Sequence, residues 1–401
     1  MMRRFLTNSM LVCGSVCATL VGIELVLRVV GLSFPVFIRS DDVLGWSFFP
    51  KVEGYSVHEA RAWVRINEAG FRDIEHQIVK PAGTFRIAVL GDSFTEGSNV
   101  AEAETFPSVM ATALSSCAAS KQAYEVLNFG VSGYGTAQSY LLLDRSVLQY
   151  QPDLVILAFY NGNDVADNSR PLSVESQKFR PYYISQNETF SIDNSFRLEA
   201  PYRHARQRSV VAHLLVNRSY LLQLGKQLFM MKSVWSGQQE SQPRRFDAAR
   251  DGAILVKPQF PEMFSPPVDK TWIDAWSVTE WLILAMRDAT LARDMRFLMV
   301  LIPDPIQVFP DEAIRRKIKE EYGLADLAYP ENRIARLAEK EGIDLLKLRE
   351  PFLQIATDDP LFLYGFPPNY GDGHWNETGN LLGGRLIGKH VCEKYATHDS
   401  Q

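Results

Sequence analysis

The sequence has little of several features that define particular classes of protein. Four cysteines in 401 residues are too few for a disulfide scaffold, and no cysteines and histidines stand at the spacing of a zinc site. Basic residues are not in excess, because the formal net charge is −5 and the pI is near 5.9, so no nucleic-acid partner is expected. No internal repeat is evident. We therefore expect a globular protein with no metal and no other cofactor.

Charge is also missing from a stretch near the N-terminus. Residues 10–23 carry no charge and lie in a mostly apolar segment that follows Arg3 and Arg4. The segment is marginal for a bilayer, which needs about 20 apolar residues. Because the arginines favour the cytoplasmic side, we expect residues 1–35 to form a transmembrane or signal-anchor helix, with the remainder of the chain periplasmic or otherwise extracytoplasmic. A cleaved signal peptide is the alternative, although no small-x-small site follows the apolar core.

Two charged residues, Glu24 and Arg28, interrupt the apolar segment near its end. They are four residues apart, so a helix places them on one face. We expect them to pair near the membrane edge.

The rest of the chain alternates between apolar runs typical of buried strands and stretches typical of helices. Strands are expected near 85–90, 124–129, 153–159, 296–302 and 343–348, with a last helix near 377–395. Such alternation predicts a five-stranded parallel sheet with helices on both faces.

The domain organisation follows from that core. We expect residues 36–84 to pack on it as an N-terminal segment, and residues 85–395 to form the main domain with an insertion at about 166–270. Within the insertion, Val210–Val234 is expected to be a helix packed on the domain, with a lid or a membrane-leaning surface as the alternative. Residues 236–245 are expected to form a mobile loop.

The most informative stretch is Arg86–Gly97, in which a buried strand breaks at Gly91-Asp92-Ser93. It delivers Ser93 to the carboxyl end of a parallel strand, where open α/β sheets bind ligands. The alternative is a purely structural role, in which Ser93 and Glu96 form a helix capping box, because Ser93-x-x-Glu96 fits that pattern.

Three further clusters follow at the ends of expected strands: Tyr124–Gly133, Leu154–Asp164 and Gly371–Gly379. With Ser93, they resemble the four signature blocks of the SGNH hydrolases, also called the GDSL esterase/lipase superfamily, in the same order. The resemblance covers roughly residues 85–165 and 290–395. It implies a three-layer α/β/α, flavodoxin-like fold.

The resemblance also implies roles for particular residues. Ser93 matches the nucleophile, His374 the general base and Asp372 the carboxylate that orients the histidine. The oxyanion hole would consist of the backbone N–H groups of Ser93 and Gly133 and the side-chain amide of Asn163. These roles suit the residue types, because a serine hydroxyl needs a base of near-neutral pKa and a carboxylate fixes the tautomer of that base. Residues two apart in an extended loop point to one side, so Asp372 and His374 are expected to face each other.

The last block departs from the commonest family pattern. It has Asp-x-His followed by Trp375, whereas many members have Asp-x-x-His-Pro. This variant is similar to the block of the alginate O-acetyltransferase branch.

The expected function is that of an exported, membrane-anchored serine esterase that cleaves O-acyl esters, especially O-acetyl groups on glycans, through an acyl-enzyme. An O-acyltransferase acting on an exported polysaccharide is the alternative, and a non-catalytic assembly or binding protein is a second. The expected partners are an acylated small molecule or glycan and the membrane.

Overall fold

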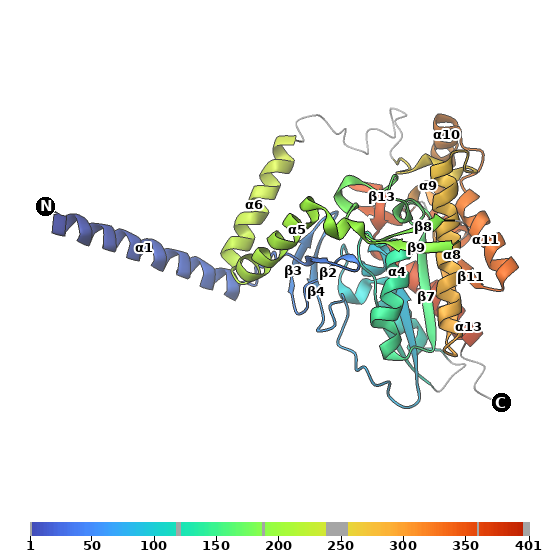
Figure 1. Ribbon diagram of the computed structural model, residues 1–401, viewed down its shortest axis with the longest axis horizontal. Helices are drawn as coiled ribbons and strands as arrows, with labels where there is room; N and C mark the ends of the chain where they lie inside the picture. Colours follow the sequence, from blue (N-terminus) through green and yellow to red (C-terminus); the bar gives the residue numbers. More distant parts are fainter. Residues whose placement is uncertain (1, 118–121, 187–188, 238–255, 359–360, 396–401) are drawn as a thin grey trace.

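A computed structural model describes residues 2–117, 122–186, 189–237, 256–358 and 361–395 (Figure 1). Its centre is a five-stranded parallel sheet in the order β11-β10-β7-β5-β6. The strands are β5 (Thr84–Leu90), β6 (Ala123–Asn128), β7 (Leu154–Tyr160), β10 (Arg296–Ile302) and β11 (Asp344–Lys347). All five coincide with strands expected from the sequence, and the predicted fold class is confirmed. Their carboxyl ends form one edge of the sheet, where the loops after β5, β6 and β7 meet.

Helices cover both faces of the sheet, because alternate strand residues bury apolar side chains on opposite sides. On one face, strand residues such as Leu157 and Met299 share a core with α4, α8 and α11. On the other, residues such as Ile156 and Val300 share a core with α3, α12 and α13. These helices are α3 (Phe106–Ser115), α4 (Thr136–Leu142), α8 (Lys270–Leu291), α11 (Tyr329–Glu341), α12 (Arg349–Asp358) and α13 (Glu377–Tyr395). The last one is the C-terminal helix expected from the sequence.

Small hairpins and short helices surround the sheet. The segment before the core contains two antiparallel hairpins, β1 (Ile38–Asp41) with β2 (Gly45–Phe48) and β3 (Glu53–Val57) with β4 (Arg61–Arg65). Two more pairs are β8 (Tyr182–Gln186) with β9 (Thr189–Asp193), and β12 (Tyr364–Phe366) with β13 (Asn369–Trp375). The short helices are α2 (Ser93–Glu96), α9 (Pro305–Val308) and α10 (Glu312–Tyr322).

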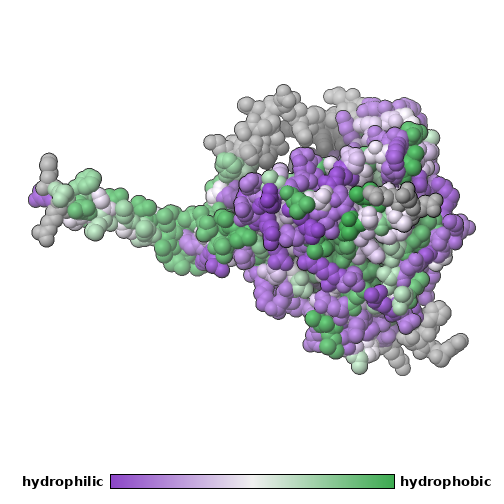
Figure 2. Space-filling model, viewed as in Figure 1, coloured by the Kyte–Doolittle hydropathy of each residue, from purple (hydrophilic) through white to green (hydrophobic). Residues whose placement is uncertain are grey.

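The N-terminal helix α1 (Met2–Val29) projects from the body of the protein (Figure 1). The part of this helix from Arg4 to Val29 is long and apolar enough to cross a membrane. Hydrophobic surface covers much of the helix up to the point where it meets the body (Figure 2). Arg28 and Glu24 form the expected ion pair, with 2.7 Å between Nη2 and Oε1.

The helix expected at Val210–Val234 is interrupted, so this prediction was wrong in its extent. The structure has α5 (Ala200–Val211), a π-helical turn at Ala212–Val216, and α6 (Tyr220–Gly237). Contacts with distant residues set the break: Asn217 Nδ2 donates to the carbonyl of Val36 at 2.9 Å, and the amide of Val36 donates to Asn217 Oδ1 at 2.7 Å. Most of the loop expected at 236–245 lies outside the described residues.

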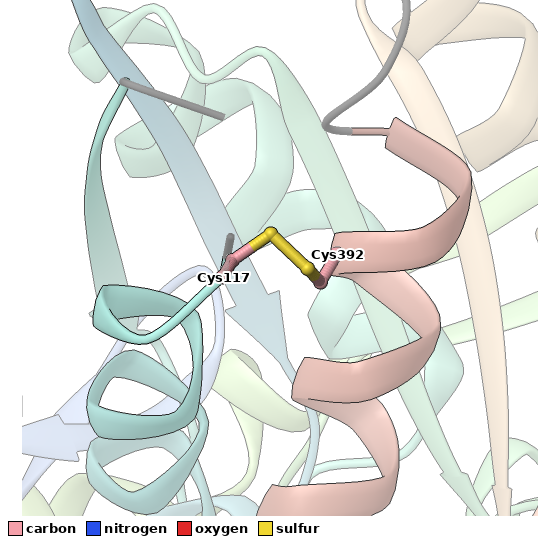
Figure 3. The surroundings of a disulfide bond; sticks show 2 residues. All are labelled: Cys117 and Cys392. Atoms are coloured by element: carbon pink, nitrogen blue, oxygen red, sulfur yellow. A yellow bond between two sulfur atoms is a disulfide. The ribbon is translucent and has the colours of Figure 1, made fainter. Parts of the chain in front are cut away.

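A disulfide joins Cys117, just after α3, to Cys392 in α13 (Figure 3). The two Cα atoms are 5.8 Å apart although the cysteines are separated by 275 positions in the sequence. The bond fastens together two helices that already pack against each other on one face of the sheet. The bond was not expected from the sequence, because no local pattern around either cysteine marks the pairing.

Candidate active site

Ser93 stands where β5 ends and α2 begins. A Cβ atom on Gly91 would lie 3.0 Å from the carbonyl oxygen of Ala158, so the chain needs glycine to turn this closely against β7. Asp92 is the N-cap of α2, because its Oδ1 accepts a hydrogen bond from the Phe94 amide at 2.9 Å.

The capping-box alternative for Ser93 is therefore wrong. Glu96 does not reach back to the start of α2. Its Oε2 accepts hydrogen bonds from the Ser132 amide, at 2.7 Å, and from the Ser132 hydroxyl. With Asp92 as the cap, the Ser93 hydroxyl is available for another partner.

That partner is His374, which lies on β13 at the far end of the sequence. Its Nε2 is 2.7 Å from Ser93 Oγ. Its Nδ1 is 2.7 Å from Glu59 Oε1, and its backbone amide donates to Glu59 Oε2 at 2.9 Å. The three side chains therefore form a continuous chain of hydrogen bonds from a carboxylate through an imidazole to a hydroxyl.

Glu59, and not Asp372, is the carboxylate at His374 Nδ1, so the role expected for Asp372 needs correction. Asp372 Oδ1 accepts a hydrogen bond from the Gly373 amide at 2.9 Å. Glu59 reaches the histidine because Gly373 has no side chain. A Cβ atom there would lie 2.6 Å from both Glu59 carboxylate oxygens, and Gly373 adopts φ +86°.

Sequence reasoning missed Glu59 because nothing marks it locally. It lies in the tight turn between β3 and β4, within the segment that precedes the core, and not at the end of a sheet strand. Its only sequence signal is an acidic residue at a hairpin turn, which is usual for a solvated position.

The charges of the site favour a protonated imidazole. Burial lowers the pKa of His374, but the hydrogen bond and negative charge of Glu59, with smaller contributions from Asp92 and Glu96, raise it above its usual value overall. Burial raises the pKa of Glu59, yet the hydrogen bonds and charge of His374 bring it below its usual value. Glu59 is thus a carboxylate that stabilises an imidazolium whenever His374 accepts a proton.

Two buried aspartates lie near this chain of groups. Burial raises the pKa of Asp92 to about 6. It also raises the pKa of Asp164 well above its usual value, and the charge of Asp92 adds to that effect. Asp164 Oδ2 accepts a hydrogen bond from the Tyr160 amide at 2.9 Å and so closes the turn that follows β7.

The residues expected to form an oxyanion hole line the same cleft as Ser93 and His374. This cleft has a volume of about 340 Å³, and Gly133 and Asn163 both border it. Gly133 has φ +76°, and a Cβ atom there would lie 2.8 Å from Gln177 Nε2, so glycine is required at this point of the loop. The preceding residue, Ser132, is held in place by Glu96. The structure thus brings Ser93 and His374, the residues expected to be nucleophile and base, to the same cleft as the three expected donors.

Most other residues that line the cleft are polar. They include His58, Ser98, Asn99, Ser132, Gln177, Lys257, Gln259, Asp304 and Asp372. A second cavity of about 600 Å³ shares His58, Ser132 and Gln177 with the cleft, and α5 forms part of its wall. Among the described residues, no group of three or more His, Cys, Asp or Glu side chains is placed to hold a metal ion.

Part of the sequence also matches a known protein family. Residues 89–256 match the sequence model of the GDSL-like lipase/acylhydrolase family, a range that contains Ser93, Gly133 and Asn163. No curated protein matches the chain.

Three solved structures are similar at low sequence identity. An acetyl xylan esterase is 15% identical, with 76% of this chain and 99% of that chain covered and a TM-score of 0.36. A catalytic mutant of an acetylxylan esterase from Geobacillus stearothermophilus is 11% identical, with coverages of 76% and 93% and a TM-score of 0.36. A GDSL-like lipase from Bacteroides thetaiotaomicron is 13% identical, with coverages of 77% and 88% and a TM-score of 0.33. At these TM-scores, the likenesses add nothing to the family match.

A serine, a histidine and a carboxylate joined in this order at the carboxyl edge of an α/β sheet are typical of serine hydrolases. The chain contains a region of the GDSL-like lipase/acylhydrolase family, matched over residues 89–256, and is an ester-hydrolysing enzyme of the SGNH type. Its similarity to the alginate O-acetyltransferase branch stays a prediction.

Proposed function

We propose that this enzyme is an exported, membrane-anchored serine esterase that removes short O-acyl groups, above all O-acetyl groups, from glycans. Ser93 is the nucleophile, His374 the general base and Glu59 the carboxylate that orients the base. The observation that carries this proposal is the pair of 2.7 Å contacts that His374 makes with Ser93 and Glu59.

The mechanism follows from the positions of these atoms. Ser93 Oγ attacks the ester carbonyl carbon while its proton passes to His374 Nε2, and Glu59 stabilises the imidazolium that forms. The negative charge on the carbonyl oxygen is stabilised by the N–H groups of Ser93 and Gly133 and by the Asn163 amide. His374 then gives its proton to the departing alcohol. Water, deprotonated by His374 in turn, attacks the acyl-enzyme and releases the carboxylic acid and Ser93.

The lining of the cleft supports a polar substrate. Hydroxyl, amide and charged side chains surround Ser93, and Lys257 and Gln259 are exposed at its border. Such groups can hydrogen-bond the many hydroxyls of a sugar, whereas a long acyl chain would be better accommodated by an apolar lining. This favours a glycan ester with a short acyl group.

Two observations support export and anchoring. Helix α1 is apolar along most of its length and has Arg3 and Arg4 in its first turn, a pattern that favours a cytoplasmic N-terminus. The bond between Cys117 and Cys392 is of a kind that persists in oxidising compartments. We therefore propose that the catalytic domain lies outside the cytoplasm.

Acyl transfer is the alternative, motivated by the Asp-x-His-Trp spacing. Hydrolysis and transfer share the acyl-enzyme and differ in whether water or a sugar hydroxyl attacks it. The carboxylate at His374 Nδ1 comes from Glu59, which lies outside that motif. The motif therefore gives transfer little support through the geometry of the base.

The test uses the detergent-solubilised full chain with p-nitrophenyl esters and acetylated glycans, with and without a deacetylated glycan acceptor. We expect release of free acetate, faster cleavage of short than of long acyl esters, and only minor diversion of acetyl to the acceptor. The Ser93→Ala variant is the control for background hydrolysis. Accumulation of acetyl on the acceptor with free acetate at background would establish transfer in place of hydrolysis.

A further inference from the structure

The segment from residue 200 to residue 231, here called the α5–α6 hairpin, exposes large apolar side chains. Seven of these side chains are between 49% and 75% exposed: Val210, Val211, Leu215, Leu222, Leu228, Phe229 and Met231. Phe229 alone is 75% exposed. An apolar surface of this kind on a stable protein usually marks a contact with a partner or a membrane.

The same hairpin has charges of only one sign. It contains five arginine and lysine residues and no aspartate or glutamate, although the whole chain has a net charge of −5. Arg203, Arg208 and Arg218 are exposed. Apolar side chains interspersed with cations are typical of segments that lie on an anionic membrane surface.

The start of α6 is fastened to the end of the anchor helix α1. Glu24 Oε1 accepts a hydrogen bond from the Tyr220 amide at 3.1 Å, and its Oε2 accepts one from the Leu221 amide at 2.9 Å. The Ser219 hydroxyl also donates to Glu24 Oε2, at 2.9 Å. Glu24 thus satisfies the free N–H groups at the start of α6, where a negative charge is favourable.

Arg28 strengthens this junction. Its Nη2 donates to the carbonyl of Arg218 at 2.6 Å, and its guanidinium lies 4.9 Å from the centre of the Tyr220 ring. The two charges that interrupt the apolar segment of α1 therefore serve as the docking point of α6. Because they lie in the last two turns of α1, the junction falls where that helix leaves the bilayer.

The polar side of α6 is already occupied by the protein. Gln223 Oε1 accepts hydrogen bonds from the Ser33 hydroxyl and the Phe34 amide at 2.9 and 2.8 Å. Lys226 Nζ donates to the carbonyl of Pro35 at 3.1 Å. Polar contacts with the chain just after α1 thus fix one side of α6 and leave apolar residues such as Leu222 and Phe229 facing outward. From the junction, α6 runs in a different direction from α1 (Figure 1).

We propose that α6 lies in the headgroup region of the bilayer that α1 crosses, with its apolar side chains in the lipid and the arginines of the hairpin on anionic phospholipid headgroups. The inference rests on the membrane anchoring proposed above. It explains why α6 carries exposed Phe, Leu and Met side chains. Because α5, in the same hairpin, borders the cavity next to the active-site cleft, a contact of the hairpin with the bilayer would also hold that cavity near the membrane surface.

The test measures fluorescence quenching by lipids brominated in their acyl chains. The full chain carries one bimane label at a time and is reconstituted in vesicles of phosphatidylcholine with equimolar phosphatidylglycerol. One label is placed at Phe229→Cys in a Cys13→Ser/Cys17→Ser background. A label at Leu291→Cys in that background is the matched control, since Leu291 is an exposed apolar residue of α8, a helix on the opposite side of the body from α1 (Figure 1). Hydrolysis of p-nitrophenyl acetate shows that each labelled protein is folded.

The native Cys17, labelled in a Cys13→Ser protein, reports on the anchor itself. We expect strong quenching at Cys17, quenching at Phe229→Cys several-fold greater than at Leu291→Cys, and a decrease at Phe229→Cys when Arg203→Gln and Arg218→Gln are added. Quenching at Cys17 with none at Phe229→Cys beyond the control would overturn this inference alone. No quenching at Cys17 would refute the anchor, and the inference with it, while esterase activity would still stand or fall by its own assay.

Discussion

Glu59 and His374 are 315 positions apart in the sequence, yet a carboxylate oxygen of one lies 2.7 Å from Nδ1 of the other. The contact joins a hairpin turn that precedes the core domain to a strand near the C-terminus. The segment before the core is therefore part of the catalytic arrangement that we propose, because it supplies the acid that orients the general base.

Replacing Glu59 by glutamine should lower kcat by about 10³–10⁴-fold, because the imidazole loses the carboxylate that fixes its tautomer and stabilises its charged form. Asp372→Asn is the matched control and should cost less than about tenfold, since it leaves the contact between His374 and Glu59 in place. Steady-state hydrolysis of p-nitrophenyl acetate measures both. The reverse order of effects would return the role of the acid to Asp372.

The pH dependence of kcat/KM should show an acid limb above the ordinary histidine pKa of about 6.5. His374 acts as a base only when neutral, and its raised pKa keeps it protonated to higher pH, so activity appears as the pH rises through that value. Residual activity of Glu59→Gln should have its acid limb at lower pH, because the charge that favours the imidazolium is gone. A limb at the same pH in both proteins would mean that Glu59 does not act on His374.

Asn163→Ala should lower kcat by about 10²–10³-fold with little change in KM, as expected for a donor that acts mainly in the transition state. Gln259→Ala is a suitable control because Gln259 lines the same cleft but is exposed at its border. Similar kcat values for both variants would remove Asn163 from the oxyanion hole.

The disulfide should contribute to stability but not to chemistry. Cys117→Ser/Cys392→Ser should lower the free energy of unfolding by about 2–4 kcal/mol, since the bond restricts the unfolded chain. Urea unfolding of the detergent-solubilised full chain measures this change, and Cys13→Ser/Cys17→Ser, which removes two exposed free thiols in α1, should not alter it. Recovery of Cys117 as a free thiol from the exported protein would contradict the pairing.

The sequence alone was sufficient to predict the five strands of the sheet. It was also sufficient to predict Ser93 and His374, two of the three residues in the hydrogen-bonded chain that Glu59 completes. Each strand of the sheet is a local apolar run, and Ser93 and His374 stand in local motifs, so neighbouring residues alone mark them. Their contact follows because β13 brings His374 over the end of β5.

Other features depend on contacts between distant residues and leave no local pattern. Glu59 is one acid among many until the fold places it beside Gly373. The division between α5 and α6 is set by Glu24 and by Val36, which lie nearly two hundred positions earlier. The pairing of Cys117 with Cys392 likewise needs the packing of α3 on α13.

The most direct test of the catalytic assignment is the site of covalent modification by a fluorophosphonate, which reacts with activated serine nucleophiles. The full chain is treated with the probe, digested and mapped by mass spectrometry, with the Ser93→Ala protein as control. We predict a single adduct on Ser93, strongly reduced labelling of Glu59→Gln, and none of Ser93→Ala. Labelling of Ser93→Ala at the wild-type level, or an adduct on another serine of the active enzyme, would contradict the account.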